Sequence, residues 1–321
     1  MREPRYPVSD HCDGRRFFNP HAHTARTPRE LIRWWRTRQR VPWPERVPRR
    51  ACAPPPDAVP PDRVAATFVG HATWLLRTAS VSILTDPVFT SHAGPFGLIG
   101  PRRVRPPALD VASLPPIDLV LLSHNHYDHL QPSSLRALGR RFDPVFVTTL
   151  GLASMLRRLG LRRVVELDWW QTADLARPER VTCVPAQHFS ARTPFDRDRT
   201  LWGGFVVSNA GKTLYFAGDT GYSPQFREIA QRVPSIDLAL VPIGAYEPRW
   251  FMRPAHVNPD EAVRIHQDVA ARTSFAMHFG TFHLTDEGID DPVQALARAR
   301  EAAGLAPETF RVIECGETAL L

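Results

Sequence analysis

The stretch "HNHYDHL", residues 124–130, follows the apolar run "IDLVLL" of residues 117–122 and gathers three histidines and one aspartate within six positions. A short run rich in Leu, Val and Ile predicts a buried strand. Functional groups at the end of a strand, presented by a loop, are the usual layout of an α/β active site. Three imidazoles this close together would repel one another when protonated, so the spacing indicates half of a metal site rather than a solvated loop.

Three further apolar runs also end in a residue that commonly binds metal ions. "VTCVPAQH" ends at His188, "TLYFAGD" at Asp219 and "SFAMH" at His278. A lone histidine of this kind is more often structural, but four such strand ends suggest one rim of a sheet. Imidazoles and carboxylates suit zinc, and also iron or manganese. Seven candidate ligands exceed the needs of one tetrahedral ion, so two ions bridged by a carboxylate fit the count better.

The order of apolar and amphipathic stretches predicts a layered α/β protein. From residue 64 onward, short β-rich runs cluster early and alternate with helical stretches later. Helices are predicted over residues 258–272, with Asn258 as the cap, and over residues 291–304, beginning at Asp291. Residues 1–63 are rich in Pro and Arg, so we expect an N-terminal extension with one short helix before a catalytic domain of residues 64–321.

Composition is that of a soluble globular protein, with 43% hydrophobic and 23% charged residues. No stretch approaches the roughly 20 apolar residues of a membrane span. Residues 1–16 lack the apolar core of a signal peptide, so we expect a cytoplasmic protein. The four cysteines are scattered and form no CxxC pair, which favours reduced, structural thiols.

The net charge of +7 is confined to the N-terminal extension. Residues 1–63 contain 14 arginines and 7 acidic residues, whereas the rest of the chain has 26 basic and 26 acidic side chains. Nucleic-acid binding needs a basic track for phosphates, and a neutral catalytic body does not provide one. We therefore expect no nucleic-acid partner.

The stretch "TPRELIRWWRTRQR", residues 27–40, predicts a short amphipathic helix. Thr27 suits the N-cap, Pro28 the first turn, and Glu30 completes a capping box. Leu31, Trp34 and Trp35 then form an apolar stripe among arginines, the pattern of a helix that lies on anionic lipid. The alternative is that the same stripe packs on the catalytic body or on a second subunit, which would make a homodimer.

Beyond the histidine spacing, the chain resembles a known family. "HNHYDH" is the signature of the metallo-β-lactamase superfamily, whose fold is an αββα four-layer sandwich. "GHATWLL", "LTDPVF", "ELDWW", "FAGDTGY", "GAYEPRWFM" and "MHFGTF" are similar, in collinear order over residues 64–317, to the N-acylphosphatidylethanolamine-hydrolysing phospholipase D family. The resemblance implies that fold and a metal-dependent hydrolase.

The resemblance divides the candidate ligands between two Zn²⁺ ions per chain, with iron or manganese as alternatives. The first ion would be held by His124, His126 and His188, the second by Asp128, His129 and His278, and Asp219 would bridge both. Asp86 would orient a ligand histidine, and the alternative is a turn cap before Pro87. His71 would support the site from beneath, and the alternative is a core histidine.

The implied reaction is hydrolysis of N-acylphosphatidylethanolamine, or a related phospholipid, to N-acylethanolamine and phosphatidic acid by a hydroxide that the two ions share. Tyr127 and His256 match family positions beside the substrate and are catalytic candidates together with Asp128 and Asp219. Arg192 matches a basic residue near the site and could bind phosphate. A phospholipid substrate implies peripheral association with a membrane.

Two departures bear on specificity. Ala255 stands where the mammalian members of the family have glutamine, and Cys315 stands where histidine is usual. Both weaken the inference that the headgroup and acyl preferences of the family are unchanged. The alternatives are another hydrolase on the same fold, such as a lactonase or a nucleotide or RNA phosphodiesterase, and a non-catalytic membrane-associated binding protein.

Overall fold

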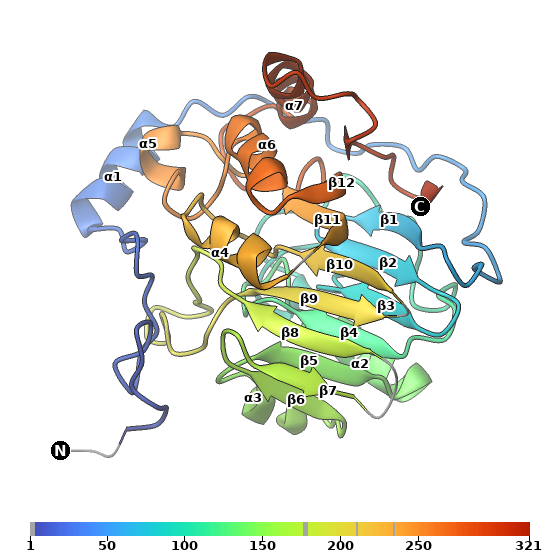
Figure 1. The fold of residues 1–321 in the computed structure, drawn as a ribbon. Coiled ribbons are helices and arrows are strands. Elements are labelled where there is room, and N and C mark those ends of the chain that lie inside the picture. Colours follow the sequence, from blue (N-terminus) through green and yellow to red (C-terminus); the bar gives the residue numbers. More distant parts are fainter. Residues whose placement is uncertain (1–3, 176–178, 210, 234) are drawn as a thin grey trace.

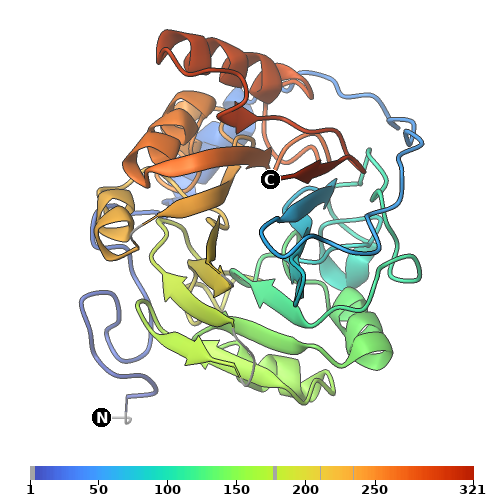
Figure 2. The same cartoon turned by 45° about the vertical axis from the view of Figure 1, so that its right-hand side comes forward.

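Two mixed β-sheets lie face to face in the computed structural model, which describes residues 4–175, 179–209, 211–233 and 235–321. Helices cover the outer faces, and the loops at one end of the sheets face the N-terminal segment (Figure 1). A second view shows the two halves of the chain, blue to green and yellow to red, on opposite sides of the interior (Figure 2). The predicted αββα four-layer sandwich is confirmed.

The first sheet has seven strands in the order β14-β1-β2-β3-β4-β5-β6. Its strands are β1 (Ala65–Gly70), β2 (Thr73–Arg77), β3 (Ser82–Thr85), β4 (Leu119–Leu122), β5 (Val145–Thr149), β6 (Val164–Leu167) and β14 (Thr318–Leu320). Strands β3 to β6 run parallel to one another, so their carboxyl ends open onto one edge of the sheet.

The second sheet also has seven strands, in the order β13-β12-β11-β10-β9-β8-β7. Its strands are β7 (Thr172–Asp174), β8 (Arg180–Val184), β9 (Gly204–Asn209), β10 (Lys212–Phe216), β11 (Ile236–Pro242), β12 (Ala271–Met277) and β13 (Phe310–Arg311). Strands β10 to β13 are parallel, and β7 to β10 are antiparallel.

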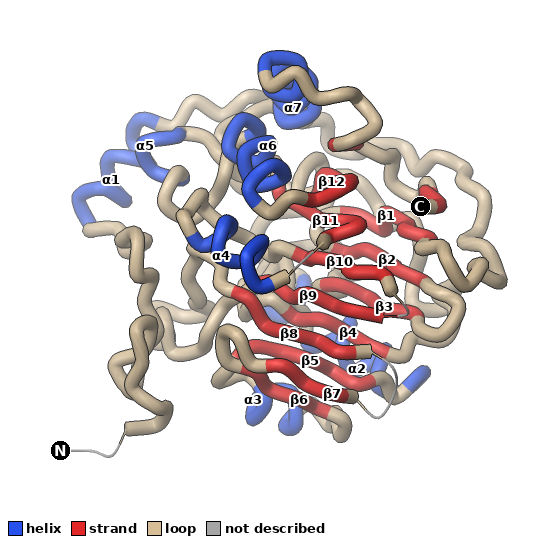
Figure 3. The backbone as a smooth tube through the Cα atoms, in the orientation of Figure 1, coloured by secondary structure: helices blue, strands red, loops and turns tan. Residues whose placement is uncertain are grey.

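Alternating side chains along the strands explain the layers. On β4, Leu119 and Leu121 enter the core between the sheets, whereas Val120 and Leu122 belong to a second cluster beneath the outer helices. Successive side chains of a strand point to opposite faces, so a strand that is apolar throughout must be covered on both sides. The helices that cover the outer faces of the sheets are blue and lie on either side of the red strands (Figure 3).

The helices divide between the two outer faces and the N-terminal segment. Their bounds are α1 (Pro28–Thr37), η1 (Pro95–Gly97, a 3₁₀ turn), α2 (Pro132–Phe142), α3 (Ala153–Arg158), α4 (Gln225–Arg232), α5 (Arg249–Met252), α6 (Pro259–Asp268) and α7 (Asp291–Ala302). Helices α2 and α3 contribute leucines to the cluster over the first sheet, and α4 and α6 pack on the second. None of the described helices is long and apolar enough to span a bilayer.

The predicted helices form, but the two in the catalytic domain end earlier than expected. Helix α6 ends at Asp268 instead of residue 272, because the chain enters β12 at Ala271, and α7 ends at Ala302 instead of residue 304. The capping boxes of α1 and α6 form as expected, at Thr27 and Asn258. Helix α7, however, has Asp290 at its N-cap, because the carboxylate of Asp291 instead accepts the N–H of Gly288 at 2.7 Å. Near the end of the chain, the backbone leaves the second sheet after β13 and joins the first as β14.

The N-terminal segment, residues 4–63, lies along the outside of the domain. Its helix α1 packs on α5, where the Trp34 and Phe251 rings stack with centroids 4.8 Å apart. Arg38 adds an ion pair to Asp286 with a nitrogen–oxygen distance of 3.0 Å. Farther along, Val47 donates its N–H to the carbonyl of Val104. The segment therefore contacts the domain along much of its length.

Candidate metal centre

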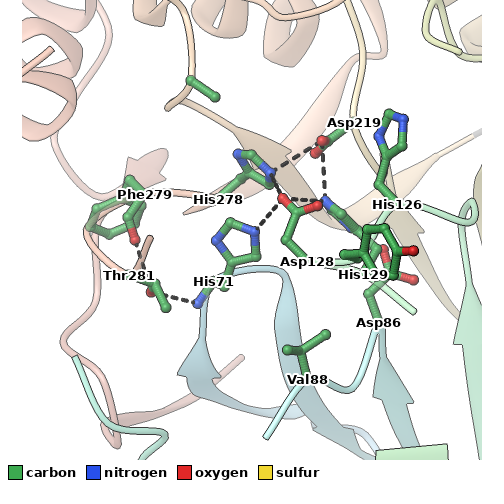
Figure 4. A network of polar contacts seen from close by, with 12 residues as sticks. His71, Asp86, Val88, His126, Asp128, His129, Asp219, His278, Phe279 and Thr281 are labelled. Atoms are coloured by element: carbon green, nitrogen blue, oxygen red, sulfur yellow. Dashed lines mark hydrogen bonds and ion pairs between the residues drawn. The ribbon is translucent and has the colours of Figure 1, made fainter. Parts of the chain in front are cut away.

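The strand ends of both sheets meet at one cluster of histidines and aspartates (Figure 4). The first sheet contributes the loop after β4, with His124, His126, Asp128 and His129, together with Asp86 after β3 and His71 between β1 and β2. The second contributes His188 beyond β8, Asp219 beyond β10 and His278 directly after β12. All seven ligand candidates from the sequence are thereby brought together.

The three histidines His124, His126 and His188 form a first donor group. The Nε2 atoms of His124 and His188 lie 2.9 and 3.2 Å from Nδ1 of His126. The Nδ1 atoms of the two outer rings are turned away, toward Ser123 Oγ at 2.9 Å for His124 and the Ala255 carbonyl at 2.8 Å for His188. An imidazole N–H held in this way leaves the opposite nitrogen free as a metal ligand.

Asp128, His129 and His278 form a second donor group. The Asp128 Oδ2 atom lies 3.5 Å from His129 Nε2 and 3.2 Å from His278 Nε2. His71 Nε2 also approaches this oxygen, at 3.0 Å, from below the group. Asp86 accepts a hydrogen bond from His129 Nδ1 at 2.6 Å and from Ser123 Oγ at 2.5 Å. Asp86 therefore lies where the sequence places it, against the back of a candidate ligand.

Asp219 lies between the two donor groups. Its Oδ2 atom is 3.1 Å from His129 Nε2 and His278 Nε2, and 3.8 Å from His188 Nε2. Its Oδ1 atom is buried without a hydrogen-bond partner among the described residues. Such an oxygen is costly unless a further group binds it. Converging nitrogens and an unpaired carboxylate oxygen fit a site for divalent cations.

The backbone at the site adopts unusual conformations that bring the strand ends close together. Gly218, before Asp219, has φ +63°, and a Cβ atom there would come within 2.8 Å of the Ser123 Cβ. Asp86, His71 and His278 also adopt positive φ, at 29°, 59° and 61°. Such conformations cost a non-glycine residue of the order of 1–3 kcal/mol and cluster at functional sites.

The two donor groups differ in charge. Burial lowers the pKa of His124 and His188 well below the usual range and that of His126 to about 4, so these imidazoles are neutral. Burial also opposes a charge on His129 and His278, but the neighbouring Asp219 and Asp128 outweigh it, and the pKa of His278 rises to about 9. A cation bound between these groups would take the place of protons, because metal ligands must be deprotonated.

The predicted substrate residues lie at the rim. His256 Nδ1 is 4.0 Å from Asp219 Oδ2, and burial lowers the His256 pKa to about 4. The Tyr127 hydroxyl donates to the carbonyl of Arg192 at 3.1 Å. The Arg192 guanidinium stacks on the Tyr127 ring and donates through Nη1 to the carbonyls of Asn125 and Leu130, so it braces the histidine loop.

Three supporting residues were not predicted from the sequence. Ser123 links His124 to Asp86, and its place directly before the histidine run is a signal that could have identified it. Arg249, in "EPRWF", donates to the His256 carbonyl at 2.8 Å and to Glu261 at 2.6 Å. Asn19 contacts the backbone of His188 from 169 positions away, and no local pattern points to it.

Comparison with known proteins agrees with this geometry. Residues 82–279 match the family model of the beta-lactamase superfamily domain. The chain is 36% identical over 266 residues to N-acyl-phosphatidylethanolamine-hydrolyzing phospholipase D 1 of Caenorhabditis elegans, covering 78% of this chain and 74% of that protein. It is 33% identical to the mitochondrial N-acyl-phosphatidylethanolamine-hydrolyzing phospholipase D of Saccharomyces cerevisiae, covering 75% of this chain and 54% of that one.

Among solved structures, the metallo hydrolase Igni18 of Ignicoccus hospitalis is similar with a TM-score of 0.63 and 24% sequence identity. The match covers 81% of this chain and 98% of Igni18, which supports the fold. The family model, the two relatives and the His/Asp cluster together indicate a hydrolase that uses a divalent metal. The chain belongs to the beta-lactamase superfamily and, within it, to the N-acyl-phosphatidylethanolamine-hydrolyzing phospholipase D family.

Proposed function

We propose that the chain is a phosphodiesterase of phospholipase D type that hydrolyses N-acylphosphatidylethanolamine, or a closely related phospholipid, with two zinc ions. The observation that carries the proposal is the position of Asp219 between two complete donor groups. A lone ion would need only one of these groups. The substrate class is supported by the relatives from worm and yeast.

The donor groups indicate which residues would hold each ion. His124, His126 and His188 would hold one, Asp128, His129 and His278 the other, and Asp219 both. When bound, two divalent ions acidify water and neutralise the charge that develops on a phosphoryl group. Asp86 fixes the ring of His129 through its 2.6 Å contact, and Ser123 does the same for His124.

The rim residues would orient the substrate. His256 has a buried Nδ1 atom without a hydrogen-bond partner among the described residues, and its lowered pKa keeps the ring neutral. A neutral imidazole there can donate one N–H to a phosphoryl oxygen. Tyr127 and Arg192 form one wall of a pocket of about 230 Å³ that also includes Phe96 and Arg136. This wall combines an apolar surface with positive charge, as a phospholipid headgroup and its chains require.

Helix α1 would hold the enzyme on the membrane. Of the predicted stripe, Trp34 is turned toward α5, whereas Trp35 is 74% exposed and Leu31 is 45% exposed. Ile32, which was not in the predicted stripe, is 52% exposed beside them. Arginines surround this outer face, and each basic residue near anionic lipid contributes about 1 kcal/mol of attraction. The inner face of α1 is therefore structural, and the outer face supports a peripheral association with lipid.

The proposed function is tested with purified protein and vesicles. We expect about two zinc ions per chain by elemental analysis and release of N-acylethanolamine from N-acylphosphatidylethanolamine, with phosphatidylcholine a poor substrate. Mass spectrometry of both products gives the cleaved bond. Rapid hydrolysis of lactones without release of N-acylethanolamine would overturn the substrate assignment, and a single tightly held iron would overturn the zinc pair.

A further inference from the structure

The backbone of His188 needs a partner that the sheet does not supply. Residues 185–188 continue beyond the end of β8, and Gln187 is paired with Gly221 on one side. In an extended chain the next residue points its N–H and carbonyl to the opposite side. For His188, which is fully buried, no strand of the described residues lies on that side. Two buried backbone groups directly at a candidate ligand therefore depend on another part of the chain.

Asn19, from the N-terminal segment, provides that partner. Its Nδ2 donates to the His188 carbonyl at 2.7 Å, and the His188 N–H donates to its Oδ1 at 3.1 Å. The indole N–H of buried Trp202 also donates to Oδ1, at 3.2 Å, and Nδ2 reaches Thr24 Oγ1 at 3.3 Å. These contacts fix which end of the amide is oxygen, and the side chain pairs with His188 as a neighbouring strand would.

The segment around Asn19 is firmly docked. Phe17 is buried with its ring 4.8 Å from that of Tyr6, and its N–H donates to the Asp198 carbonyl at 2.8 Å. His11 stacks on Trp169 with ring centroids 4.3 Å apart and contacts Asp168 at 2.8 Å. The Tyr6 hydroxyl donates to the Arg199 carbonyl. Asn19 is thus held by the docked residues that precede it and does not depend on its own hydrogen bonds alone to stay in place.

We propose that Asn19 is a positioning residue for the metal ligand His188, so that the N-terminal segment is part of the metal centre. The inference rests on the proposed role of His188 as a ligand. The His188 ring is fixed from one end by the Ala255 carbonyl and at its backbone by Asn19. Loss of the backbone contact lets the ring move relative to His124 and His126. Partners of this kind typically change metal affinity 10–100-fold.

The test uses the full chain and two substitutions at one position. Asn19→Asp keeps the acceptor for the N–H groups of His188 and Trp202 but loses the donor to the His188 carbonyl, and Asn19→Ala loses both. Tyr6→Phe is the matched control, because it removes one hydrogen bond from the same segment to Arg199 without touching His188. Zinc affinity is measured by competition with a chromophoric chelator, and the Co²⁺-substituted proteins are compared by their visible absorption.

We expect Asn19→Ala to lower the affinity for one of the two zinc ions about 10–100-fold. The Co²⁺ spectrum should change, kcat should fall and KM should stay nearly unchanged. Asn19→Asp puts a carboxylate oxygen in place of the nitrogen that faces the His188 carbonyl, so it should weaken the same ion at least as much as Asn19→Ala, and Tyr6→Phe should bind zinc normally. Normal zinc affinity and an unchanged spectrum in both Asn19 variants would overturn the inference, even if their melting temperatures fall. Absence of any bound divalent ion in the unsubstituted chain would instead overturn the proposed function.

Discussion

The metal centre and the N-terminal segment meet at His188 but are built in different ways. The centre is made of mostly buried side chains at the ends of strands, and neighbouring groups fix the rings of candidate ligands such as His129 and His188. The segment is mostly extended chain, and its helix α1 has no buried residue. The two sheets fix the positions of the candidate ligands. The N-terminal segment, in contrast, is held in place by scattered side chains that contact residues distant in the sequence. Substitutions in the centre should therefore change metal affinity and activity, whereas substitutions in the segment should mainly change the stability of the fold or the binding to vesicles.

The largest expected effect belongs to the centre. Asp219→Ala removes the carboxylate between the donor groups. We expect activity to fall by more than about 100-fold, which is the largest loss typical of substitutions at residues that only hold a metal ligand in place. At least one ion should be lost in elemental analysis. Glu301→Ala, on the exposed surface of α7, is the control. Retention of both ions and of activity by Asp219→Ala would place the reaction elsewhere.

Asp86→Asn tests how strongly the centre depends on residues behind the ligands. The substitution keeps the size of the side chain but removes the charged acceptor for His129 Nδ1. We expect metal affinity to fall about 10–100-fold, measured by chelator competition. An unchanged affinity would mean that Asp86 acts only as a turn cap before Pro87, the alternative reading of its sequence.

Two adjacent tryptophans separate structure from surface within the segment. Trp34→Ala removes the ring stacked on Phe251, and we expect the free energy of unfolding to fall by about 1–3 kcal/mol. Trp35→Ala, at an exposed position, should change stability by less than about 0.5 kcal/mol but reduce co-sedimentation with anionic vesicles. Vesicle binding that survives Trp35→Ala together with Leu31→Ala would make α1 purely structural.

The smallest effect concerns pH. Burial opposes a charge on His11, but Asp168 and Asp10 outweigh it and raise the His11 pKa above its usual 6.5. The resulting stability is fully present below pH 6.5 and is lost as the pH rises through the raised pKa. His11→Phe retains the stacking on Trp169 and should lower the free energy of unfolding at pH 6 more than at pH 9. Denaturant titrations at both values measure the difference, and an equal loss at both pH values would contradict it.

Sequence reasoning reached the centre because its information is local. His188, Asp219 and His278 each follow an apolar run, and His124 lies in a dense group, so strand periodicity alone brought them into one rim. Helices α2, α3 and α4 and strand β7 were not predicted, since short elements depend on tertiary packing more than on pattern. Asn19 was missed for a stronger reason: its role exists only in the pairing with His188.

The division of the donors between the two sheets has a thermodynamic consequence. The first sheet brings His124, His126, Asp128 and His129, and the second brings His188, Asp219 and His278. A chain in which either half is unfolded therefore has neither donor group complete. An ion that binds only the fully folded state stabilises it by about 2.7 kcal/mol at a free concentration 100 times its Kd. Unfolding of the halves should thus be coupled through the ion, and chelation should turn one cooperative transition into an earlier and broader one.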